Sequence, residues 1–393
     1  MPNYVDNYQN KIHRAFDNSP LVTTPTALEK ARAVLAAESL IAVDTESDSL
    51  YSYFEKVCLI QFSTRHADYV VDPLAFSKNV EPLRPIFADT NIGKVFHAAE
   101  YDILCMKRDY HFAFSNLFDT MIAARILGWK NVGLGNILQE RFGVVLNKKM
   151  QRADWGQRPL TDEHVEYARE DTHYLLGLRD LQIQELERME RIEEAREEFE
   201  RLARVEPTPR RFDPDAYWNI NGARDLDKTG LGVLRELYGW RESQARREDR
   251  PPFKIISDST MLYLADARPS SIRELDNIPG ISSYLVRRYS RAIIEAVTQG
   301  HAAPQNTPPK PRARMEQPLD NLARDRMTKL KEWRKKCATE RGVESDVIVS
   351  NDVLMALARK NPRTLENVVA VSGLGPWKSK MYAEQMFKVL HPK

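Results

Sequence analysis

The chain has 393 residues, which at about 150 residues per domain predicts two or three domains. Hydrophobic residues make up 42% of it, enough for sizeable cores, and no run approaches the roughly 18 apolar residues of a membrane span. The three cysteines lie far apart and form neither a zinc pattern nor a disulfide framework, as is typical of a reducing cytosol. No apolar signal-peptide core follows the first residues, so we expect a cytoplasmic protein with no membrane partner.

The net charge of +2 is unevenly distributed along the chain. Residues 301–393 hold 18 Lys and Arg against 10 Asp and Glu, which leaves residues 1–300 with a net charge of −6. A basic carboxyl-terminal part is typical of proteins that attract polyanions, and an acid-rich front is compatible with catalysis or metal binding. Ordinary solvated surface charge explains the same numbers.

The first half of the chain alternates between strand and helix patterns. The predicted elements are a helix over 26–37, strands over 40–43, 57–62, 69–71 and 94–97, a helical segment through 102–106, and a long helix from 161 through 178. Thr26 and Thr161 fit N-caps of their helices, and the strands are continuous apolar runs of the kind that are buried. This order predicts an α/β domain with a mixed sheet covered by helices.

Two proline-rich breaks and one charged segment divide the remainder. Residues 185–202 are densely charged at helical spacing, which predicts a solvated helix with many i,i+4 pairs. Pro207-Thr-Pro209 marks a predicted domain boundary. Residues 301–318 hold five prolines and are predicted to be a semi-rigid linker.

An internal repeat flanks this linker. A shift of 93 residues aligns the two segments without a gap and superimposes Leu237 on Leu330, Trp240 on Trp333, Pro269 on Pro362, Gly280 on Gly373 and Tyr289 on Tyr382. We therefore predict two small all-α domains of one design.

A glycine-containing turn between helices recurs in both copies. Gly280 and Gly373 permit a positive φ and a close backbone approach, either to a nucleic-acid phosphate or to the neighbouring helix. Lys378 and Lys380 follow the second turn and favour phosphate contact there.

Scattered acids form the main candidate site. Asp44 and Glu46 follow a buried strand, Asp102 lies at the start of a helix after another strand, and two further residues, Tyr167 and Asp171, lie four apart on one helix face. Adjacent carboxylates repel each other, and a divalent cation relieves that repulsion. Each piece alone also fits a solvated acidic turn or helix.

Taken together, the order Asp-x-Glu, Asp, Tyr-x-x-x-Asp resembles the three exonuclease motifs of the DEDD superfamily, in its tyrosine-bearing branch. The segments Val57-Cys-Leu-Ile-Gln61 and Asp154-Trp-Gly-Gln-Arg-Pro-Leu-Thr161 resemble the ribonuclease D family, and the two repeats resemble HRDC domains. The resemblance implies a ribonuclease H-like exonuclease domain at 1–206, a first HRDC-like domain at 207–300, a linker at 301–318 and a second HRDC-like domain at 319–393.

The resemblance also implies a mechanism. Two divalent ions, Mg²⁺ or Mn²⁺, are expected, with Asp44 bridging both, Glu46 and Asp171 on the nucleophile-side ion and Asp102 on the other. Tyr167 is expected to orient the attacking water. The implied activity is 3′–5′ exoribonuclease release of nucleoside 5′-monophosphates, with tRNA precursors and other small stable RNAs as partners and no obligate protein partner.

Substrate contacts and alternatives stay open at this stage. Candidate substrate-binding residues are His97, Lys148, Lys149, Arg152, Trp155, Arg158, Lys378 and Lys380. For the loop cations solvation, and for Trp155 a place in the core, fit equally well. Ser47-Asp48-Ser49 stands where the family often has an aromatic residue, which affects how the terminal base is held. The alternatives are a DNA 3′–5′ exonuclease and an inactive RNA-binding protein.

Overall fold

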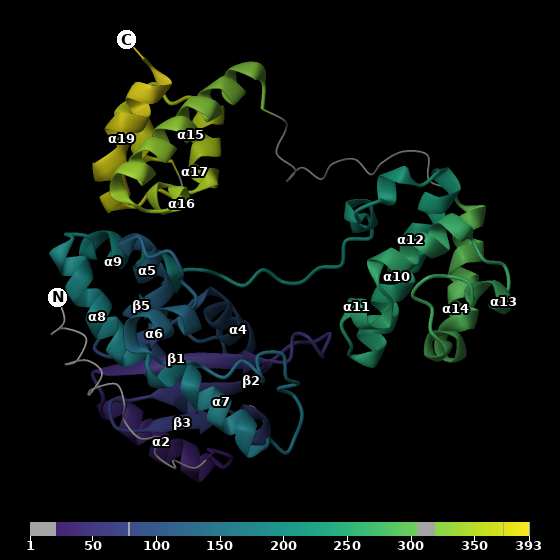
Figure 1. Cartoon of the computed structure of the whole chain (residues 1–393), viewed down its shortest axis with the longest axis horizontal. Helices are drawn as coiled ribbons and strands as arrows, with labels where there is room; N and C mark the ends of the chain where they lie inside the picture. Colours follow the sequence, from purple (N-terminus) through teal and green to yellow (C-terminus); the bar gives the residue numbers. More distant parts are fainter. Residues whose placement is uncertain (1–20, 78, 305–318, 372, 393) are drawn as a thin grey trace. The chain divides into compact units, whose positions relative to one another are not determined.

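The computed structural model describes residues 21–77, 79–304, 319–371 and 373–392 (Figure 1). The chain forms two compact units. The first contains the described residues of 1–47, 57–207 and 317–393, and the second contains 48–56 and those of 208–316. The sheet predicted for the first half of the chain lies in the first unit.

A five-stranded mixed sheet forms the centre of the first unit. Its strands are β1 (Leu40–Ser47), β2 (Val57–Ser63), β3 (Asp68–Val71), β4 (Gly93–Phe96) and β5 (Leu117–Asp119), in the spatial order β3-β2-β1-β4-β5. The β1–β2 and β2–β3 pairs are antiparallel, whereas β4 is parallel to both β1 and β5. The predicted mixed sheet is confirmed, with β5 as a strand that the sequence patterns did not predict.

Strand β1 is longer than predicted. Asp44, Thr45 and Glu46 lie within it, because the pairing with β2 continues through Glu46, opposite Leu59, to a bulge at Ser47. The expectation that the acids follow the strand was therefore wrong. Side chains alternate along a strand, so Asp44 and Glu46 share one face of the sheet.

Helices cover the sheet (Figure 1). They are α2 (Pro25–Ala37), α3 (Arg84–Ala88), α4 (Glu100–Tyr110), α5 (Thr120–Leu127), α6 (Leu134–Phe142), α7 (Asp162–His173), α8 (Leu175–Arg188) and α9 (Ile192–Ala203), with 3₁₀ turns at Pro73–Phe76 and Glu81–Leu83. The N-cap of α2 is Thr24 rather than the predicted Thr26, because Pro25 occupies the first helical position, where its missing N–H costs nothing.

The long helix predicted from Thr161 through Leu178 is two helices. Thr161 caps α7 as expected, and its hydroxyl accepts from the backbone N–H of His164. The helix ends at His173, and α8 begins after Tyr174. Both helices contact β1, but α7 packs mainly on β2 and β3 and α8 mainly on α5, and the break lets each helix follow its own surface.

Two helical modules follow, built on one plan. The first has α10 (Lys228–Glu248), α11 (Pro252–Ile255), α12 (Asp258–Ala267), α13 (Ile272–Leu275) and α14 (Ser283–Ala302), preceded by 3₁₀ turns at Ala216–Asn219 and Ala223–Asp225. The second has α15 (Asn321–Arg341), α16 (Ser345–Ile348), α17 (Asn351–Lys360), α18 (Leu365–Val369) and α19 (Pro376–Leu390). Each helix of the second module begins 93 residues after its counterpart, which confirms the predicted repeat.

The turn glycines serve packing within the modules. Gly280 has a φ of 84° and Gly373 a φ of 94°, so both adopt the left-handed conformation. A Cβ on Gly280 would lie 2.1 Å from the Oγ1 of Thr260. The close approach at this turn is therefore to the neighbouring helix α12.

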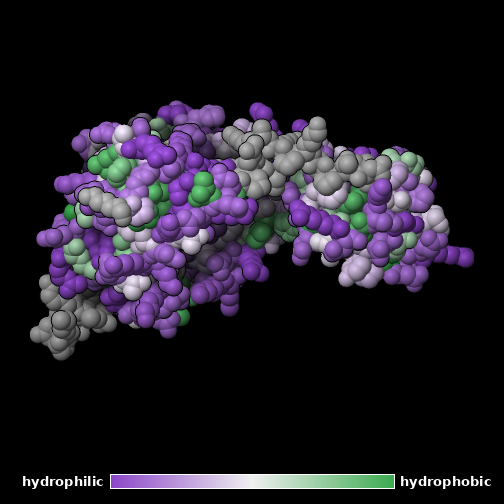
Figure 2. Space-filling model, turned by 90° about the horizontal axis from the view of Figure 1, so that it is seen from above, coloured by the Kyte–Doolittle hydropathy of each residue, from purple (hydrophilic) through white to green (hydrophobic). Residues whose placement is uncertain are grey.

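The ends of the linker differ slightly from the prediction. Helix α14 continues through Ala302, so the predicted linker begins inside it, and most of 301–318 lies outside the described residues. Figure 2 shows a mostly hydrophilic surface in that view, with hydrophobic residues in separate patches. Among the helices of the described ranges, none is both long and apolar enough to cross a bilayer.

Candidate active site

Three carboxylates meet at the face of β1 that α7 covers. Oxygen atoms of Asp44, Glu46 and Asp171 all lie within 4.8 Å of one another. Asp44 and Glu46 come from β1 and Asp171 from the last turn of α7, which packs against β1 and β2. The structure thus brings together acids that are far apart in the sequence.

Asp102 lies beside this group rather than within it. It stands in the first turn of α4, is 6% exposed, and accepts a hydrogen bond from the hydroxyl of Thr45. Asp119 fixes the start of that helix, since its carboxylate accepts from the backbone N–H of Ala99 at 2.7 Å. Ala98, immediately before, has a positive φ of 62°, which turns the chain sharply from β4 into α4.

Thr45 and Asp119 are supporting residues that the sequence reasoning missed. Thr45 lies between Asp44 and Glu46. Because β1 continues through these residues, the strand places the hydroxyl of Thr45 where it donates to Asp102. For Asp119 the signal was available: an Asp followed by Thr and then an apolar helical run is an N-cap pattern, and Asp119 does cap α5.

Burial and mutual repulsion raise the pKa values of the whole cluster. The pKa of Asp44 lies well above its usual range because of burial and the charges of Asp102, Asp171 and Glu46, and that of Glu46 is raised by burial and by Asp171 and Asp102. Burial raises the pKa of Asp102 to about 7, and burial together with the charge of Glu170 raises that of Asp171 to about 7. Without a cation the cluster therefore retains protons near neutral pH.

The donor set fits hard divalent cations. Carboxylate oxygens are the ligands that Mg²⁺ and Mn²⁺ prefer, and Mg²⁺ is usually bound through a few carboxylates with water completing its shell. Gln61 adds an independent observation: it is fully buried, lies opposite Asp44 in the β1–β2 ladder, and neither amide atom has a described hydrogen-bond partner. A hydrated ion at Asp44 would bring water within the reach of that amide.

Tyr167 faces the same cluster from α7. The pKa of its phenol is raised by burial and by the charges of Asp171, Glu46 and Asp44. The phenol therefore remains protonated at a pH at which the acids begin to ionise, and it can donate a hydrogen bond there. Its ring packs near Trp155, with centroids 5.8 Å apart.

His97 is neutral and held within the domain. Its Nδ1 lies 2.8 Å from the hydroxyl of Thr120, and that hydroxyl donates to the carbonyl of Phe96, so the imidazole donates from Nδ1. Burial lowers the pKa of His97 to about 4. A contact with substrate would therefore involve the neutral ring.

The segment between α6 and α7 contains both exposed cations and buried side chains. Lys148, Lys149 and Arg152 are exposed, so they can contact a polyanion. Trp155 is 2% exposed and packs in a hydrophobic cluster with Leu59 and other residues. The structure therefore supports a place for Trp155 in the hydrophobic core rather than a contact with substrate.

Arg158 is bound within the protein. Its guanidinium donates to both oxygens of Asp72, at 2.7 and 2.8 Å, and to the carbonyls of Cys58 and Trp155. Asp72 is 2% exposed and has its charge compensated by this pair. The observed role of Arg158 is to fasten the segment before α7 to the sheet.

The two lysines after the second turn glycine differ in their surroundings. Lys378 is 6% exposed, and its Nζ lies 2.6 Å from the Oε1 of Glu198 on α9. Its ammonium is thus already paired within the first unit, which differs from the expected phosphate contact. Lys380 is exposed, as a phosphate contact requires.

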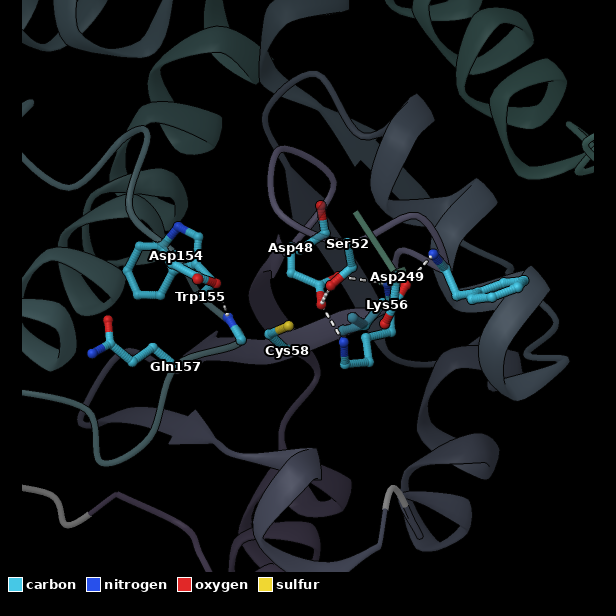
Figure 3. Close-up of polar contacts among 12 residues, drawn as sticks. Asp48, Ser52, Lys56, Cys58, Asp154, Trp155, Gln157 and Asp249 are labelled. Carbon is cyan, nitrogen blue, oxygen red and sulfur yellow. Dashed lines mark hydrogen bonds and ion pairs between the residues drawn. The ribbon is translucent and has the colours of Figure 1, made fainter. Parts of the chain in front are cut away.

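Asp48, which stands in the unusual Ser-Asp-Ser segment, organises the loop after β1 (Figure 3). It is 1% exposed and accepts from the hydroxyl of Ser52, from the backbone N–H of Lys56 and from that residue's ammonium. In the second unit this loop binds the first module, since the N–H of Phe54 donates to Asp249 at 2.8 Å. Asp48 is therefore a loop organiser with its charge compensated.

Comparisons with known proteins agree with this geometry. A family model described as a 3′–5′ exonuclease matches residues 20–186, and an HRDC domain model matches 230–297 and again 323–390, at the offset of 93 residues found in the repeat. The chain is 31% identical to a ribonuclease D of Sphingobium indicum over 67% of this chain and 68% of that protein. It is 34% identical to the protein RRP6-like 3 of Arabidopsis thaliana over 66% of its own length, but spans only 32% of that relative.

A solved structure shares the fold. The catalytic core of RRP6 from Trypanosoma brucei superimposes with a TM-score of 0.67, is 34% identical, and covers 72% of this chain and 80% of its own. The fold and the acid cluster define a 3′–5′ exonuclease domain joined to HRDC modules. The chain belongs to the ribonuclease D family.

Metal binding should strengthen as the pH rises. Carboxyls with pKa values near 7 must release protons before they ligate, so below pH 7 protons compete with the cation. We expect Mn²⁺ to bind at least about tenfold more tightly at pH 8 than at pH 6, with proton release, because one retained proton costs about a factor of ten per pH unit. Titration calorimetry in two buffers of different ionisation enthalpy measures both quantities. Equal affinity at the two pH values would contradict the raised pKa values.

Replacement of Arg158 should cost stability. Arg158→Ala leaves the buried Asp72 unpaired, for which we expect a loss of about 3 kcal/mol in the free energy of unfolding. Lys149→Ala, at an exposed position of the same segment, is the control and should change stability by less than about 0.5 kcal/mol. Urea unfolding of both variants decides the point, and equal stabilities would remove the structural role of Arg158.

Proposed function

We propose that this protein is a 3′–5′ exoribonuclease that uses two divalent ions, Mg²⁺ or Mn²⁺, to remove nucleotides one at a time from RNA 3′ ends. The observation that carries the proposal is the convergence of Asp44, Glu46 and Asp171, with Asp102 beside them and the protonated phenol of Tyr167 facing them. Nothing about the stability of the fold requires like charges at this place. Clustered carboxylates are required, however, for a reaction in which negative charge builds up next to bound cations, because the carboxylates hold those cations.

The chain's own residues have distinct parts in the proposed reaction. Asp44, Glu46 and Asp171 would hold one ion, and Asp44 with Asp102 the other, directly or through water. The ions, when bound, supply a water of lowered pKa and compensate the charge on the leaving oxygen. In the overall reaction the P–O3′ bond breaks, water adds to phosphorus, and the products are a nucleoside 5′-monophosphate and a shortened strand with a free 3′-hydroxyl.

Tyr167 is proposed to position the attacking water. A phenol that stays protonated beside carboxylates is a donor, and a donated hydrogen bond fixes where a water molecule points its lone pairs. Tyr167 comes from the same helix as Asp171, one turn earlier, so the group that holds the water and the group that holds the ion move together.

RNA is the proposed substrate class, and 3′-extended tRNA precursors and other small stable RNAs are its proposed natural examples. The support is the name and similarity of the Sphingobium ribonuclease D, together with exposed Lys148, Lys149 and Arg152 near the third motif. Salt-dependent contacts of such cations with phosphates add affinity without reading sequence.

The test is digestion of a 3′-extended tRNA precursor beside matched single-stranded RNA and DNA, with Mg²⁺, Mn²⁺ or EDTA. We expect stepwise release of mononucleotides from RNA that stops on chelation and in Asp44→Asn, which removes a carboxylate that would hold the ions. Asp154→Asn, outside the cluster, is the control and should retain the wild-type rate.

Other results of this digestion would favour one of the alternative functions. Faster digestion of DNA than of RNA would make the protein a DNA exonuclease. RNA binding without cleavage in either metal would make it a binding protein with an inactive nuclease fold. Release of oligonucleotides from internal sites would contradict an exonuclease altogether.

Tyr167→Phe should affect turnover more than binding. Loss of the hydroxyl removes the donor but keeps the ring that packs near Trp155. We expect kcat to fall about 10²-fold or more, as is usual when a positioned hydrogen-bond donor is removed from an active site, with RNA affinity changed by less than threefold. Single-turnover kinetics and anisotropy in EDTA separate the two effects. Unchanged turnover would exclude Tyr167 from the mechanism.

A further inference from the structure

A second polar group lies beneath the last turn of α7, on the same face of the sheet as the acid cluster. Ser63 ends β2, and Asp68 begins β3 directly opposite it in the β2–β3 ladder. Ser63 is also paired with Ala42 of β1, which stands two residues before Asp44. Because paired residues share a face and side chains alternate along a strand, Ser63 and Asp68 point to the same side of the sheet as Asp44.

Hydrogen bonds connect this hairpin to the end of α7. The carboxylate of Asp68 accepts on one oxygen from the hydroxyl of Ser63 at 2.6 Å and on the other from the Nδ1 of His173 at 2.8 Å. Because the Ser63 proton is used in this way, the hydroxyl of Thr172 donates to the Ser63 oxygen, at 2.7 Å. We call these four residues the α7 anchor: Ser63, Asp68, Thr172 and His173.

The α7 anchor is shielded from water. Ser63, Asp68 and Thr172 are fully buried, and the side chain of His173 is 2% exposed. A buried carboxylate is costly unless donors compensate it, and a hydrogen bond in the interior is electrostatically stronger than one in water. The anchor is therefore a firm contact between the hairpin and the helix.

This contact lies next to Asp171 in the sequence. Thr172 and His173 follow Asp171 directly and are the last residues of α7, and the chain breaks at Tyr174 before α8 begins. The last carbonyl groups of a helix have no partners within it, so a final turn depends on side chains that fasten it. The place of the Asp171 carboxylate thus depends on a turn that the anchor holds.

Apolar contacts hold the same helix one turn earlier. Ala168 belongs to a hydrophobic cluster with Leu59 and Trp155, and Tyr167 packs against that cluster. Burial of apolar surface is not directional, whereas a hydrogen bond fixes both a distance and an angle. The apolar cluster therefore keeps α7 on the sheet, and the anchor sets the rotation of the helix about its own axis.

This rotation matters because the acids repel one another. Burial and neighbouring charges raise the pKa values of Asp44 and Glu46, and Asp171 is one of those charges for both. Their repulsion favours a rotation of α7 that takes Asp171 away from β1. Directional bonds at the end of the helix oppose that rotation.

We propose that Asp68 and His173 are positioning residues that hold Asp171 in the acid cluster against this repulsion. The inference rests on the proposed function, since it explains how one ligand of the ion site is kept in place. The two residues act through the helix and take no part in the chemistry. Partners that orient metal ligands usually contribute about ten- to a hundredfold to metal affinity or activity.

The experiment measures Mn²⁺ binding to the full chain by titration calorimetry at about pH 8, without RNA. His173→Ala removes the donor to Asp68, whereas His173→Asn supplies an amide N–H close to the place of Nδ1. We expect Mn²⁺ to bind at least about tenfold more weakly to His173→Ala and to Asp68→Ala. His173→Asn should remain within about threefold of the wild type, because the hydrogen bond and not the volume of the ring is required.

Two control variants separate positioning from stability. Lys94 is fully buried on β4 and its ammonium donates to the carbonyl of Asp89 at 2.6 Å, so Lys94→Met should lower the temperature of thermal unfolding without moving α7. Arg65 lies in the same hairpin as the anchor but pairs with Asp180 of α8. Lys94→Met and Arg65→Ala should both bind Mn²⁺ within about twofold of the wild type.

Two results of the titrations would overturn the proposal. Wild-type Mn²⁺ affinity in His173→Ala would show that Asp171 needs no anchor. Equal losses of affinity in Lys94→Met and His173→Ala would reduce the effect to general stability. Circular dichroism verifies that each variant is folded at the temperature of the titration.

Turnover gives an independent measurement. With Mg²⁺ and a short single-stranded RNA, His173→Ala should lower kcat about tenfold or more and change KM by less than threefold, because it displaces a metal ligand and leaves substrate contacts in place. A change confined to KM would contradict a role in positioning Asp171.

Amide hydrogen exchange of the metal-free protein separates this inference from the proposed function. The last turn of α7 should exchange faster in His173→Ala than in the wild type, since local opening is limited by the contacts that hold a segment. If the wild type neither binds Mn²⁺ nor cleaves RNA, the proposed function fails, while faster exchange would still show that the anchor holds α7. Unchanged exchange in this turn would overturn the anchor itself.

Discussion

The repulsion among four carboxylates is the interaction on which the rest of the exonuclease domain depends. Burial next to one another raises the pKa values of Asp44, Glu46, Asp102 and Asp171, so their proximity opposes folding in the absence of a cation. The scaffold resists this with apolar packing behind β1 and with hydrogen bonds that fix Asp102 and the helices that carry the acids. Thr45 holds Asp102, Asp119 holds the start of α4, and the cap of α7 fixes the helix of Asp171. The result is a rigid group of charges that a bound cation would compensate.

The sequence predicted the mixed sheet, the repeat and the acids of this site because each rests on a local rule. Apolar runs indicate buried strands, a spacing of four residues places Tyr167 and Asp171 on one helix face, and a shared pattern of Trp, Pro and Gly reveals the repeat. The order of the three motifs then turned weak individual patterns into one specific interpretation.

What the sequence did not reveal depends on partners that are distant along the chain. In the sequence, Arg158 resembles a free loop cation and Lys378 a phosphate ligand. In the structure, Arg158 pairs with Asp72 and Lys378 pairs with Glu198. The full length of β1 follows from its pairing with β2, and Gln61 gains its meaning only from its place opposite Asp44. Charge and residue type alone do not tell a cation that is already paired from one that is available to a ligand.

The two HRDC modules share one helical framework but differ in how the N-terminus of the last helix is capped. A helix begins with N–H groups that need acceptors, and α14 satisfies one of them with Ser282. Since Gly375 has no side chain to do the same for α19, docking of Glu197 from α9 satisfies groups that water would otherwise have to solvate, and this makes the contact favourable for both partners. Glu248 of the first module and Arg341 of the second occupy equivalent positions of the repeat. Arg341 pairs with Glu194 of α9, whereas Glu248 pairs with arginines of its own module. A few surface positions thus distinguish the module whose last helix is capped by α9 from the module that caps its own last helix.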